Sequence, residues 1–339
     1  MDKYILVIGL GSMGKRRIRN LQTLGIKRIV GLDVRADRRK EAEEKYLVET
    51  ESDFQKAFDK YSFHALIISL PPDVHHIYMK KALELDIPAF IEASVVDTDF
   101  ELLITEAKRK GVLLAPSCTL HFHPAIKKIG EIIKNNQLGK ISNFLYHSGQ
   151  YLPDWHSYEP VEEYYVSNKA TGGGREIVPF ELTWITLLLG MPKRVVGFYK
   201  KTIEIKGAED IDDTYNLLLD YGTSIFNLSV DVVSRYATRR MVINGDQKQL
   251  YWNWEDNLIK IFNSESNTWE EIKYETISAQ EGYNKNITEQ MYIDEMEAFF
   301  KAVRNEEAFP NNLKHDHQVL KILYSVEESD LENKIKVLL

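Results

Sequence analysis

A short apolar run followed by three glycines opens the chain and constrains the fold more than any other feature. Residues 4–8 (YILVI) are apolar without interruption, as expected of a parallel strand buried on both faces. Gly9, Gly11 and Gly14 then follow in the spacing G-x-G-x-x-G. In a dinucleotide-binding turn, the first glycine forms the turn, the second lets a pyrophosphate approach the backbone, and the third allows close packing of helix on strand. The N–H groups at the start of the next helix would hold the phosphates.

An acidic residue after the second apolar run supports the same interpretation. Asp33 lies 19 residues after Gly14 (33 − 14), where an acidic side chain binds the adenosine ribose of NAD. The basic residues that follow leave an alternative open, because arginines at this place can hold the extra phosphate of NADP. Arg35, Arg38 and Arg39 are the candidates, and a solvated helix start explains them equally well. We expect NAD, with NADP possible.

Length, charge and cysteine content limit the classes of protein that need consideration. The 339 residues are enough for two domains with a large core. A net charge of −8 argues against nucleic acid or an anionic membrane as a partner. We expect no membrane span and no signal peptide, since the apolar segment at the N-terminus is a short strand. The one cysteine, Cys118, excludes an internal disulfide and fits the reducing cytoplasm.

The hydrophobic pattern changes along the chain and predicts two domains. The first third alternates short apolar strands with helical patterns, as in a doubly wound parallel sheet. From about residue 141, strand-like segments separated by turn residues predict a mostly antiparallel sheet. The expected strands are at 28–33, 65–70, 89–92 and 112–115, and then at 141–148, 194–202, 213–220, 224–232, 239–244, 247–254, 258–262 and 268–274. Helices are expected at 38–46, 53–58, 75–83 and 100–110, with two amphipathic helices at the end.

Several motifs, in order, resemble the glucose–fructose oxidoreductase / inositol dehydrogenase (Gfo/Idh/MocA) family. Besides the glycine turn these are SLPPDVHHIYMKKALE (69–84), FIEAS (90–94), HFHPAIKKI (121–129), LGKI (138–141) and GGGREIVPFELTWITLLLG (172–190). The resemblance implies an α/β protein with a Rossmann domain at 1–120 and a substrate-binding and oligomerisation domain at 121–339. The second domain would have a large open sheet, and the final helices would pack back on the first domain. It also implies NAD(P), a sugar, polyol or nucleotide-sugar substrate, and a homo-oligomer, dimer or tetramer. The segment 149–174 is most similar to members from bacterial surface-sugar and sialic-acid-like pathways.

The glycine turn and the resemblance together give a set of cofactor-binding residues. The predicted contacts are Gly9, Gly11, Ser12, Met13, Gly14, Asp33, Arg35, Ser69, Pro71, His75 and Glu92.

Two departures from the family pattern affect the chemistry. The family has Glu-Lys-Pro where this chain has Glu92-Ala93-Ser94, and it has His-x-x-Asp where Phe180 and Thr183 stand here. Oxidation of an alcohol needs a base with a pKa near the working pH, and neither alanine nor phenylalanine can serve. The leading hypothesis is an NAD(P)-dependent oxidoreductase with a rearranged acid/base set. The alternative is a non-catalytic member that binds cofactor and sugar as a sensor or partner subunit.

Polar and aromatic residues around the triple glycine supply candidates for the missing groups. Carboxylates and aromatic rings so close together suit a sugar pocket, although a solvated loop is the alternative. The predicted substrate-binding residues are Asp154, Trp155, Tyr164, Arg175 and Glu176; the predicted bases are Glu181, Lys169 and His156. In a helix, Glu181 is rotated by roughly 100° from Phe180, so it does not simply take over the place of the usual histidine. Glu176 is a further candidate base.

Paired histidines and an apolar strand complete the sequence-based expectations. The pairs His121/His123 and His315/His317 have a spacing that could place two ligands on one side of a strand, but nothing nearby in sequence completes either set. We therefore expect no metal site. The run 217–219 is apolar at both alternations, which is more than one covered face requires and favours a homo-oligomer formed through the sheet.

Overall fold

The computed structural model describes residues 3–155, 159–277 and 288–338. The chain forms two compact units. The first unit comprises Met1–Cys118 and Tyr292–His317, and the second comprises Thr119–Met291 and Gln318–Leu339. The chain therefore returns to the first unit near its end. This arrangement places most of helix α8 (Glu289–Val303) in the first unit and most of helix α9 (Leu313–Glu332) in the second.

The first unit is built on a six-stranded parallel sheet in the order β3-β2-β1-β4-β5-β6. Its strands are β1 (Tyr4–Ile8), β2 (Ile29–Leu32), β3 (Glu49–Glu51), β4 (Phe63–Ile68), β5 (Ala89–Ile91) and β6 (Leu114–Pro116). Its helices include α1 (Ser12–Thr23), α2 (Ala36–Tyr46), α3 (Phe54–Lys60), α4 (His75–Glu84) and α5 (Phe100–Lys110). This strand order is that of the dinucleotide-binding Rossmann fold, whose direction of winding reverses between the first and fourth strands. The predicted doubly wound sheet is confirmed.

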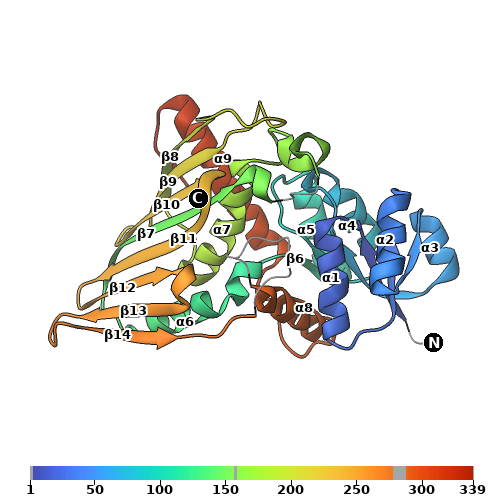
Figure 1. Ribbon diagram of the computed structural model, residues 1–339, viewed down its shortest axis with the longest axis horizontal. Helices are drawn as coiled ribbons and strands as arrows, with labels where there is room; N and C mark the ends of the chain where they lie inside the picture. The colour runs from blue at the N-terminus through green and yellow to red at the C-terminus, as the bar shows by residue number, and fades with distance from the viewer. Residues whose placement is uncertain (1–2, 156–158, 278–287, 339) are drawn as a thin grey trace. The chain divides into compact units, whose positions relative to one another are not determined.

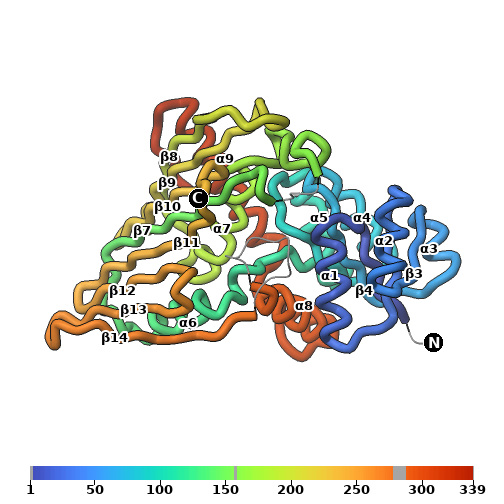
Figure 2. The backbone as a smooth tube through the Cα atoms, in the orientation of Figure 1, coloured from blue at the N-terminus to red at the C-terminus, as the bar shows by residue number. Residues whose placement is uncertain are grey.

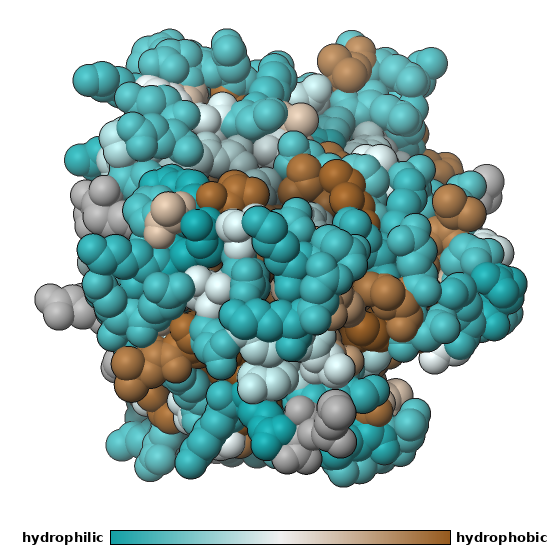
Figure 3. Space-filling model, turned by 90° about the vertical axis from the view of Figure 1, so that its right-hand side faces the viewer, coloured by the Kyte–Doolittle hydropathy of each residue, from teal (hydrophilic) through white to brown (hydrophobic). Residues whose placement is uncertain are grey.

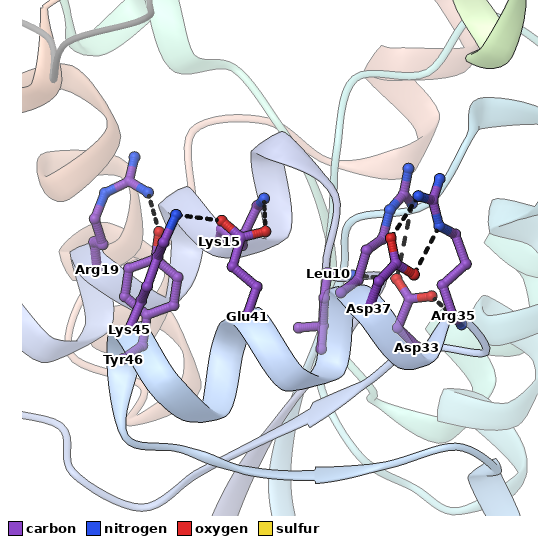
Figure 4. A network of polar contacts seen from close by, with 10 residues as sticks. Leu10, Lys15, Arg19, Asp33, Arg35, Asp37, Glu41, Lys45 and Tyr46 are labelled. Carbon is purple, nitrogen blue, oxygen red and sulfur yellow. Dashed lines mark hydrogen bonds and ion pairs between the residues drawn. The ribbon is translucent and has the colours of Figure 1, made fainter. Parts of the chain in front are cut away.

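Helix α1 is fixed by its apolar face and by charged contacts to α2. Ile18 and Leu21 are fully buried, and burial of such a side chain contributes about 1.5–3 kcal/mol. Lys15 and Lys45 both pair with Glu41, at 2.6 and 2.8 Å (Figure 4). Partly exposed ion pairs contribute at most about 1 kcal/mol each. The apolar face therefore holds the helix, and the Lys15–Glu41 pair links it to α2, whereas Lys45 and Glu41 both belong to α2.

The second unit contains a nine-stranded sheet in the order β14-β13-β12-β11-β7-β10-β9-β8-β15, which can be followed in Figure 2. The strands are β7 (Ile141–Tyr151), β8 (Arg194–Lys200), β9 (Thr214–Asp220), β10 (Ile225–Asp231), β11 (Val233–Gly245), β12 (Lys248–Asn253), β13 (Leu258–Asn263), β14 (Thr268–Lys273) and β15 (Lys336–Val337). Only β7 and β10 pair in parallel among these described strands. A mostly antiparallel sheet was expected and is confirmed.

Helices α6 (Pro124–Lys134) and α7 (Gly174–Leu189) lie against one face of the nine-stranded sheet (Figure 1). Along β7, Phe144 and Tyr146 are buried on this face, whereas Leu145 between them is about half-exposed on the other. In β9, Leu217 and Leu219 are buried and Leu218 is 45% exposed. The opposite face of the sheet thus carries apolar side chains in contact with solvent.

The ends of several elements differ from the sequence prediction for local reasons. Strand β6 begins at Leu114 instead of Val112, because the Val112 N–H still bonds to Ala107 of the preceding helix after a left-handed Gly111. Helix α6 begins at Pro124 with His123 as its N-cap. The short strands β3 and β15 were not predicted, since neither has an apolar pattern of its own.

Three further observations concern membrane spans, metal sites and the surface of the described residues. No helix among them is both long and apolar enough to cross a membrane. Within residues 3–155, 159–277 and 288–338, no group of three or more His, Cys, Asp or Glu side chains could hold a metal ion. The face shown in Figure 3 is mostly hydrophilic, with separate hydrophobic patches.

Candidate functional site

The three glycines of the first turn are required for different reasons. Gly9 has φ +89°, and a Cβ atom there would lie 2.4 Å from the carbonyl oxygen of Ser69. A Cβ atom on Gly14 would lie 1.8 Å from the carbonyl oxygen of Gly9. A Cβ atom on Gly11, by contrast, would have Arg38 Nη1 as its nearest neighbour, at a distance of 3.6 Å. Packing therefore requires Gly9 and Gly14, whereas Gly11 leaves the open approach that a pyrophosphate needs.

The start of α1 directly after this turn suits an anion. Its first turn consists of Ser12, Met13, Gly14 and Lys15, and Gly11 is the N-cap residue. Backbone N–H groups at a helix N-terminus attract phosphate, and the basic or uncharged side chains of this turn add no repulsion. Ser12 and Met13 thus lie where the sequence placed phosphate contacts.

Asp33, directly after β2, is held in a fixed orientation by backbone donors. Its Oδ2 accepts a hydrogen bond of 2.8 Å from the Leu10 N–H, and its Oδ1 accepts one of 2.8 Å from the Arg35 N–H (Figure 4). The side chain of Arg35 turns instead to Asp37, at 2.6 Å. Asp33 is therefore preorganised beside the glycine turn, and Arg35 contributes its backbone rather than its guanidinium.

A network of buried and partly buried polar side chains includes the residues that directly follow β4 and β5. Arg17 donates from Nε and Nη2 to the two carboxylate oxygens of Glu92, at 2.6 and 2.8 Å, and Ser69 Oγ donates to the same carboxylate at 3.2 Å. Nη2 of Arg17 also lies 2.9 Å from Glu295. Burial alone would lower the pKa of Arg17, but the carboxylates of Glu92 and Glu295 outweigh it and raise that pKa further above its ordinary value. The sequence analysis predicted Ser69 and Glu92 as cofactor contacts. It did not include Arg17, because the partners of Arg17 are distant in sequence.

His75 is buried at the start of α4, beyond the turn that contains Pro71. Its Nε2–H donates to the carbonyl of Leu70 at 2.7 Å, and burial lowers the pKa of the ring, so His75 is neutral. Its Nδ1 is buried without a hydrogen-bond partner among the residues that the structure describes. His75 therefore holds the loop after β4 and keeps one free acceptor.

In the second unit, Glu181 is surrounded by donors from several elements. Its buried carboxylate accepts hydrogen bonds from Tyr146 Oη (2.9 Å), Ser148 Oγ (2.7 Å), Trp184 Nε1 (2.8 Å), and Arg239 Nε and Nη2 (3.2 and 3.1 Å). A carboxylate that accepts this many hydrogen bonds has few acceptor positions left for a substrate hydroxyl. The geometry therefore does not favour Glu181, the first of the sequence-based candidates, as a base.

Glu176, one and a half turns earlier in α7, has a different environment. Its Oε1 accepts a hydrogen bond from the Tyr165 hydroxyl, and its Oε2 is buried with no partner in the described part of the chain. Burial raises the pKa of this carboxyl to about 7, against the lowering effect of the hydrogen bond from Tyr165. Glu176 can thus exchange a proton near neutral pH, as a general acid or base must.

The other predicted substrate and base residues have structural or exposed positions. Arg175 forms an ion pair with Glu327 at 2.6 Å and donates to the carbonyl of Ala170 at 2.5 Å. Lys169 lies 3.5 Å from Asp212, and its side chain is 65% exposed. His156 lies outside the described residues.

The loop before α7 contains the remaining predicted residues. Asp154, at the end of a short helical turn (Leu152–Asp154), is exposed, and the hydroxyl-bearing side chain of Tyr164 is buried. Trp155 Nε1 is buried without a partner among the described atoms. Phe180 and Thr183 follow within α7, where Thr183 Oγ1 donates to the carbonyl of Pro179 at 2.8 Å.

Comparison with known families assigns a domain type to each of the two units. The family model described as an oxidoreductase family with an NAD-binding Rossmann fold matches residues 3–117, and the model of the GFO/IDH/MocA C-terminal domain matches residues 126–251. The chain belongs to the Gfo/Idh/MocA family. Its N-terminal domain is accordingly an NAD-binding Rossmann domain of an oxidoreductase family, as the glycine turn and Asp33 predicted.

Solved structures share this fold over the full length of the chain at low sequence identity. Levoglucosan dehydrogenase in complex with NADH and levoglucosan is 16% identical, with a TM-score of 0.84 and coverage of 99% of both chains. An oxidoreductase domain protein from Kribbella flavida is 17% identical, with the same TM-score and coverage. An oxidoreductase from Agrobacterium radiobacter in complex with NAD+, L-tartaric acid and magnesium is 11% identical, with a TM-score of 0.83 over 99% of this chain and 98% of that one. No curated protein matches the chain at the sequence level.

Proposed function

We propose that this protein is an NAD-dependent oxidoreductase that interconverts a secondary hydroxyl and the corresponding carbonyl of a sugar, polyol or nucleotide sugar. The arrangement that carries the proposal is the open approach at Gly11 beside the fixed carboxylate of Asp33. Structures of the same fold were determined with NADH and levoglucosan or with NAD+, which supports this class of cofactor and substrate.

The residues of the first unit suit a dinucleotide. The start of α1 would hold the pyrophosphate, and Asp33 would accept hydrogen bonds from the hydroxyls of the adenosine ribose. A bound nicotinamide would supply the hydride acceptor for the substrate carbon. Ser69, Glu92 and the free Nδ1 of His75 are the polar groups at the strand ends that would orient that half of the cofactor.

The proton of the substrate hydroxyl requires an acceptor, and we assign that role to Glu176. Its Oε2 is unpartnered among the described residues and titrates near neutral pH, whereas Tyr165 on Oε1 fixes the orientation of the carboxylate. Glu181 is saturated by four donor groups, and Lys169 is largely exposed. His156 stays a candidate, because it lies outside the described residues.

The substrate class follows from the polar and aromatic loop between β7 and α7. Segment 149–174 resembles members of bacterial surface-sugar pathways, and the buried Trp155 Nε1 and Glu176 Oε2 are unpartnered polar atoms of the kind that bind hydroxyls. We therefore favour a sugar or nucleotide sugar as the substrate.

A spectroscopic experiment tests the proposal. NAD+ bound to the purified protein is incubated with a panel of sugars, polyols and nucleotide sugars, and absorbance is followed at the band of the reduced nicotinamide. We expect an increase that depends on one class of substrate and that the Glu176→Gln variant lowers about a hundredfold or more. An unchanged band despite measurable binding of both cofactor and sugar would contradict an enzyme.

That last outcome would favour the second candidate function, a non-catalytic member that senses or presents a sugar. The observation behind it is the loss of both usual groups, which are replaced by Ala93 and Phe180. Restoration of these groups with Ala93→Lys and Phe180→His is the matching test. Activity that appears only in this double variant would identify the natural protein as a binder.

We further propose that the protein acts in the cytoplasm as a homo-oligomer joined through its large sheet. The exposed face of that sheet carries Leu145, Phe198, Leu218 and Ile225, and burial of such a face is the usual reason for association. The single buried thiol of Cys118 is compatible with a reducing compartment.

A further inference from the structure

Asp316 is a buried carboxyl group of the first unit and lies outside the set of predicted cofactor contacts. It belongs to the first turn of α9, and only 3% of the residue is exposed. Its Oδ2 is buried and has no hydrogen-bond partner of normal geometry among the residues that the structure describes, and the same is true of the Ser94 hydroxyl. Buried polar atoms nearly always have such partners, because an unpaired one costs free energy. Two of them in one place indicate a site that is used.

The surroundings of Asp316 place it at one end of the predicted cofactor site. The side chain of Ser94, the third residue after β5, acts directly on the Asp316 carboxyl. Asn311, just before α9, donates to the carbonyl of Pro116, the last residue of β6, at 3.2 Å. In this strand order a dinucleotide crosses the carboxyl ends of the strands, and the acidic residue after β2, here Asp33, takes the adenosine. The nicotinamide half would then face the ends of β4, β5 and β6, where Ser94 lies.

The charge of Asp316 changes close to neutral pH. Burial raises the pKa of its carboxyl to about 6, against the lowering effects of the Ser94 hydroxyl and the Asn311 side chain. A carboxyl with such a pKa is easily shifted between its two forms by another charge, because a neighbouring positive charge favours the ionised form. Asp316 can therefore respond to the charge of a bound ligand.

The other titratable groups around Asp316 do not provide the same change of charge. The Cys118 thiol, after β6, stays protonated because burial raises its pKa and nearby carboxylates, that of Asp316 included, raise it further. His315, on the same helix, stays neutral because burial lowers its pKa. His317 is engaged elsewhere, since its Nε2 lies 3.2 Å from Asp97.

We propose that Asp316 is a proton-binding residue that follows the charge of the nicotinamide, so that its carboxyl is ionised beside the oxidised cofactor and protonated beside the reduced one. The inference rests on the proposed use of NAD. The oxidised nicotinamide ring carries a positive charge that the reduced ring lacks, and in a buried site such a charge attracts a carboxylate strongly. The proton comes from water and returns to water, so the exchange needs no further reactant.

This arrangement links the choice between NAD+ and NADH to pH. When Asp316 is ionised, its negative charge favours NAD+; when it is protonated, that advantage is lost. The ratio of the dissociation constant of NADH to that of NAD+ should therefore rise with pH around pH 6. This ratio reports on Asp316 better than either affinity does, because a general weakening of the site affects both cofactors alike.

Titrations with NAD+ and NADH at pH values from about 5.5 to about 7.5 test the assignment on the full-length protein. Asp316→Asn removes the titratable group and keeps the shape of the side chain, and Ser94→Ala removes the hydroxyl that lowers the pKa of Asp316. His317→Gln is the matched control, because it changes the adjacent histidine, which pairs with Asp97. All three are combined with Glu176→Gln, since Glu176 also titrates near neutral pH. Thermal melting verifies folding, and calorimetry in buffers of different ionisation enthalpy counts the protons released.

With Asp316 present, we expect the ratio to rise about threefold or more over this range, and NAD+ to release more protons than NADH on binding. Asp316→Asn should abolish both effects, His317→Gln should preserve them, and Ser94→Ala should move the rise to higher pH. If Asp316→Asn does not fold, the shift in Ser94→Ala decides.

Four results would overturn the assignment. These are a ratio independent of pH, a pH dependence that survives in Asp316→Asn, its loss in His317→Gln, and an unmoved rise in Ser94→Ala. Absence of binding for both NAD+ and NADH would instead contradict the proposed function itself.

Discussion

Two glutamates on the same helix, five residues apart, show how much the surroundings of a single residue decide. Glu181 accepts hydrogen bonds from four side chains, whereas Glu176 has one hydroxyl partner and a buried oxygen without one in the described structure. The sequence identified both as candidate bases and ranked Glu181 first. Their difference depends on Tyr146, Ser148 and Arg239, which come from strands that sequence patterns do not place next to a given helix position.

At the same scale, Glu176→Gln should change the pH dependence of stability as well as activity. The folded carboxyl has a pKa of about 7, above its ordinary value of 4.5, so the folded state retains a proton that the unfolded state has released. This group therefore lowers the free energy of unfolding as pH rises through that interval. At about pH 8 the glutamine variant should be more stable than the natural protein by up to about 3 kcal/mol, and at about pH 4 the two should be equal. Urea denaturation at both pH values measures this difference, and a difference independent of pH would contradict the raised pKa.

Glu181→Gln should instead destabilise the protein. The substitution leaves the buried guanidinium of Arg239 without its counter-charge, which costs about 3–5 kcal/mol in comparable buried pairs. Replacement of both partners in the Glu181→Gln, Arg239→Met variant removes the uncompensated charge and should recover part of that loss. Urea denaturation at neutral pH measures both variants. Normal stability of the single variant together with a loss of turnover would return Glu181 to the list of catalytic bases.

At the scale of elements, the sequence predicted those with a clear period and missed those defined by their neighbours. Helix α5 (Phe100–Lys110) has the bounds that its pattern indicated, and most predicted strands of the large sheet agree within a few residues, whereas β11 begins at Val233 instead of 239. Strand β3 has no apolar pattern and exists because β2 offers it a partner. The network of Arg17, Glu92 and Glu295 was likewise missed, since it joins α1, the end of β5 and α8.

The turn between β1 and α1 gives the sharpest prediction at this scale. A Cβ atom at Gly11 meets only the flexible guanidinium of Arg38, at an ordinary contact distance of 3.6 Å, so Gly11→Val should fold normally. It should lose cofactor affinity about tenfold or more, because the side chain occupies the approach of the pyrophosphate. Valine at Gly14 meets the backbone of Gly9, so Gly14→Val should lower stability by about 1–3 kcal/mol or more. Thermal melting and calorimetry with NAD+ distinguish the two effects. Unchanged NAD+ affinity in a folded Gly11→Val protein would exclude this turn as the binding site.

At the scale of the whole molecule, the exposed face of the nine-stranded sheet remains to be accounted for. The sequence predicted apolar residues at both alternations of β9, and the structure places Leu217 and Leu219 in the core and Leu218 on the other face. The sequence pattern could not show what covers that face. A monomer rarely leaves a contiguous apolar face in water.

If two copies associate through this face, a charge on it should separate them. Leu218→Asp places a carboxylate on the exposed face, where burial without a partner would cost several kcal/mol. The matched control is Leu47→Asp, the same substitution at a residue of the first unit that is 87% exposed and has φ 55°, a conformation that aspartate tolerates. Light scattering at micromolar concentration should give a multiple of the 39.3 kDa chain mass for the natural protein and for the control, and the mass of one chain for Leu218→Asp. A monomeric natural protein, or an oligomer that Leu218→Asp leaves intact with unchanged thermal stability, would exclude this face as the interface.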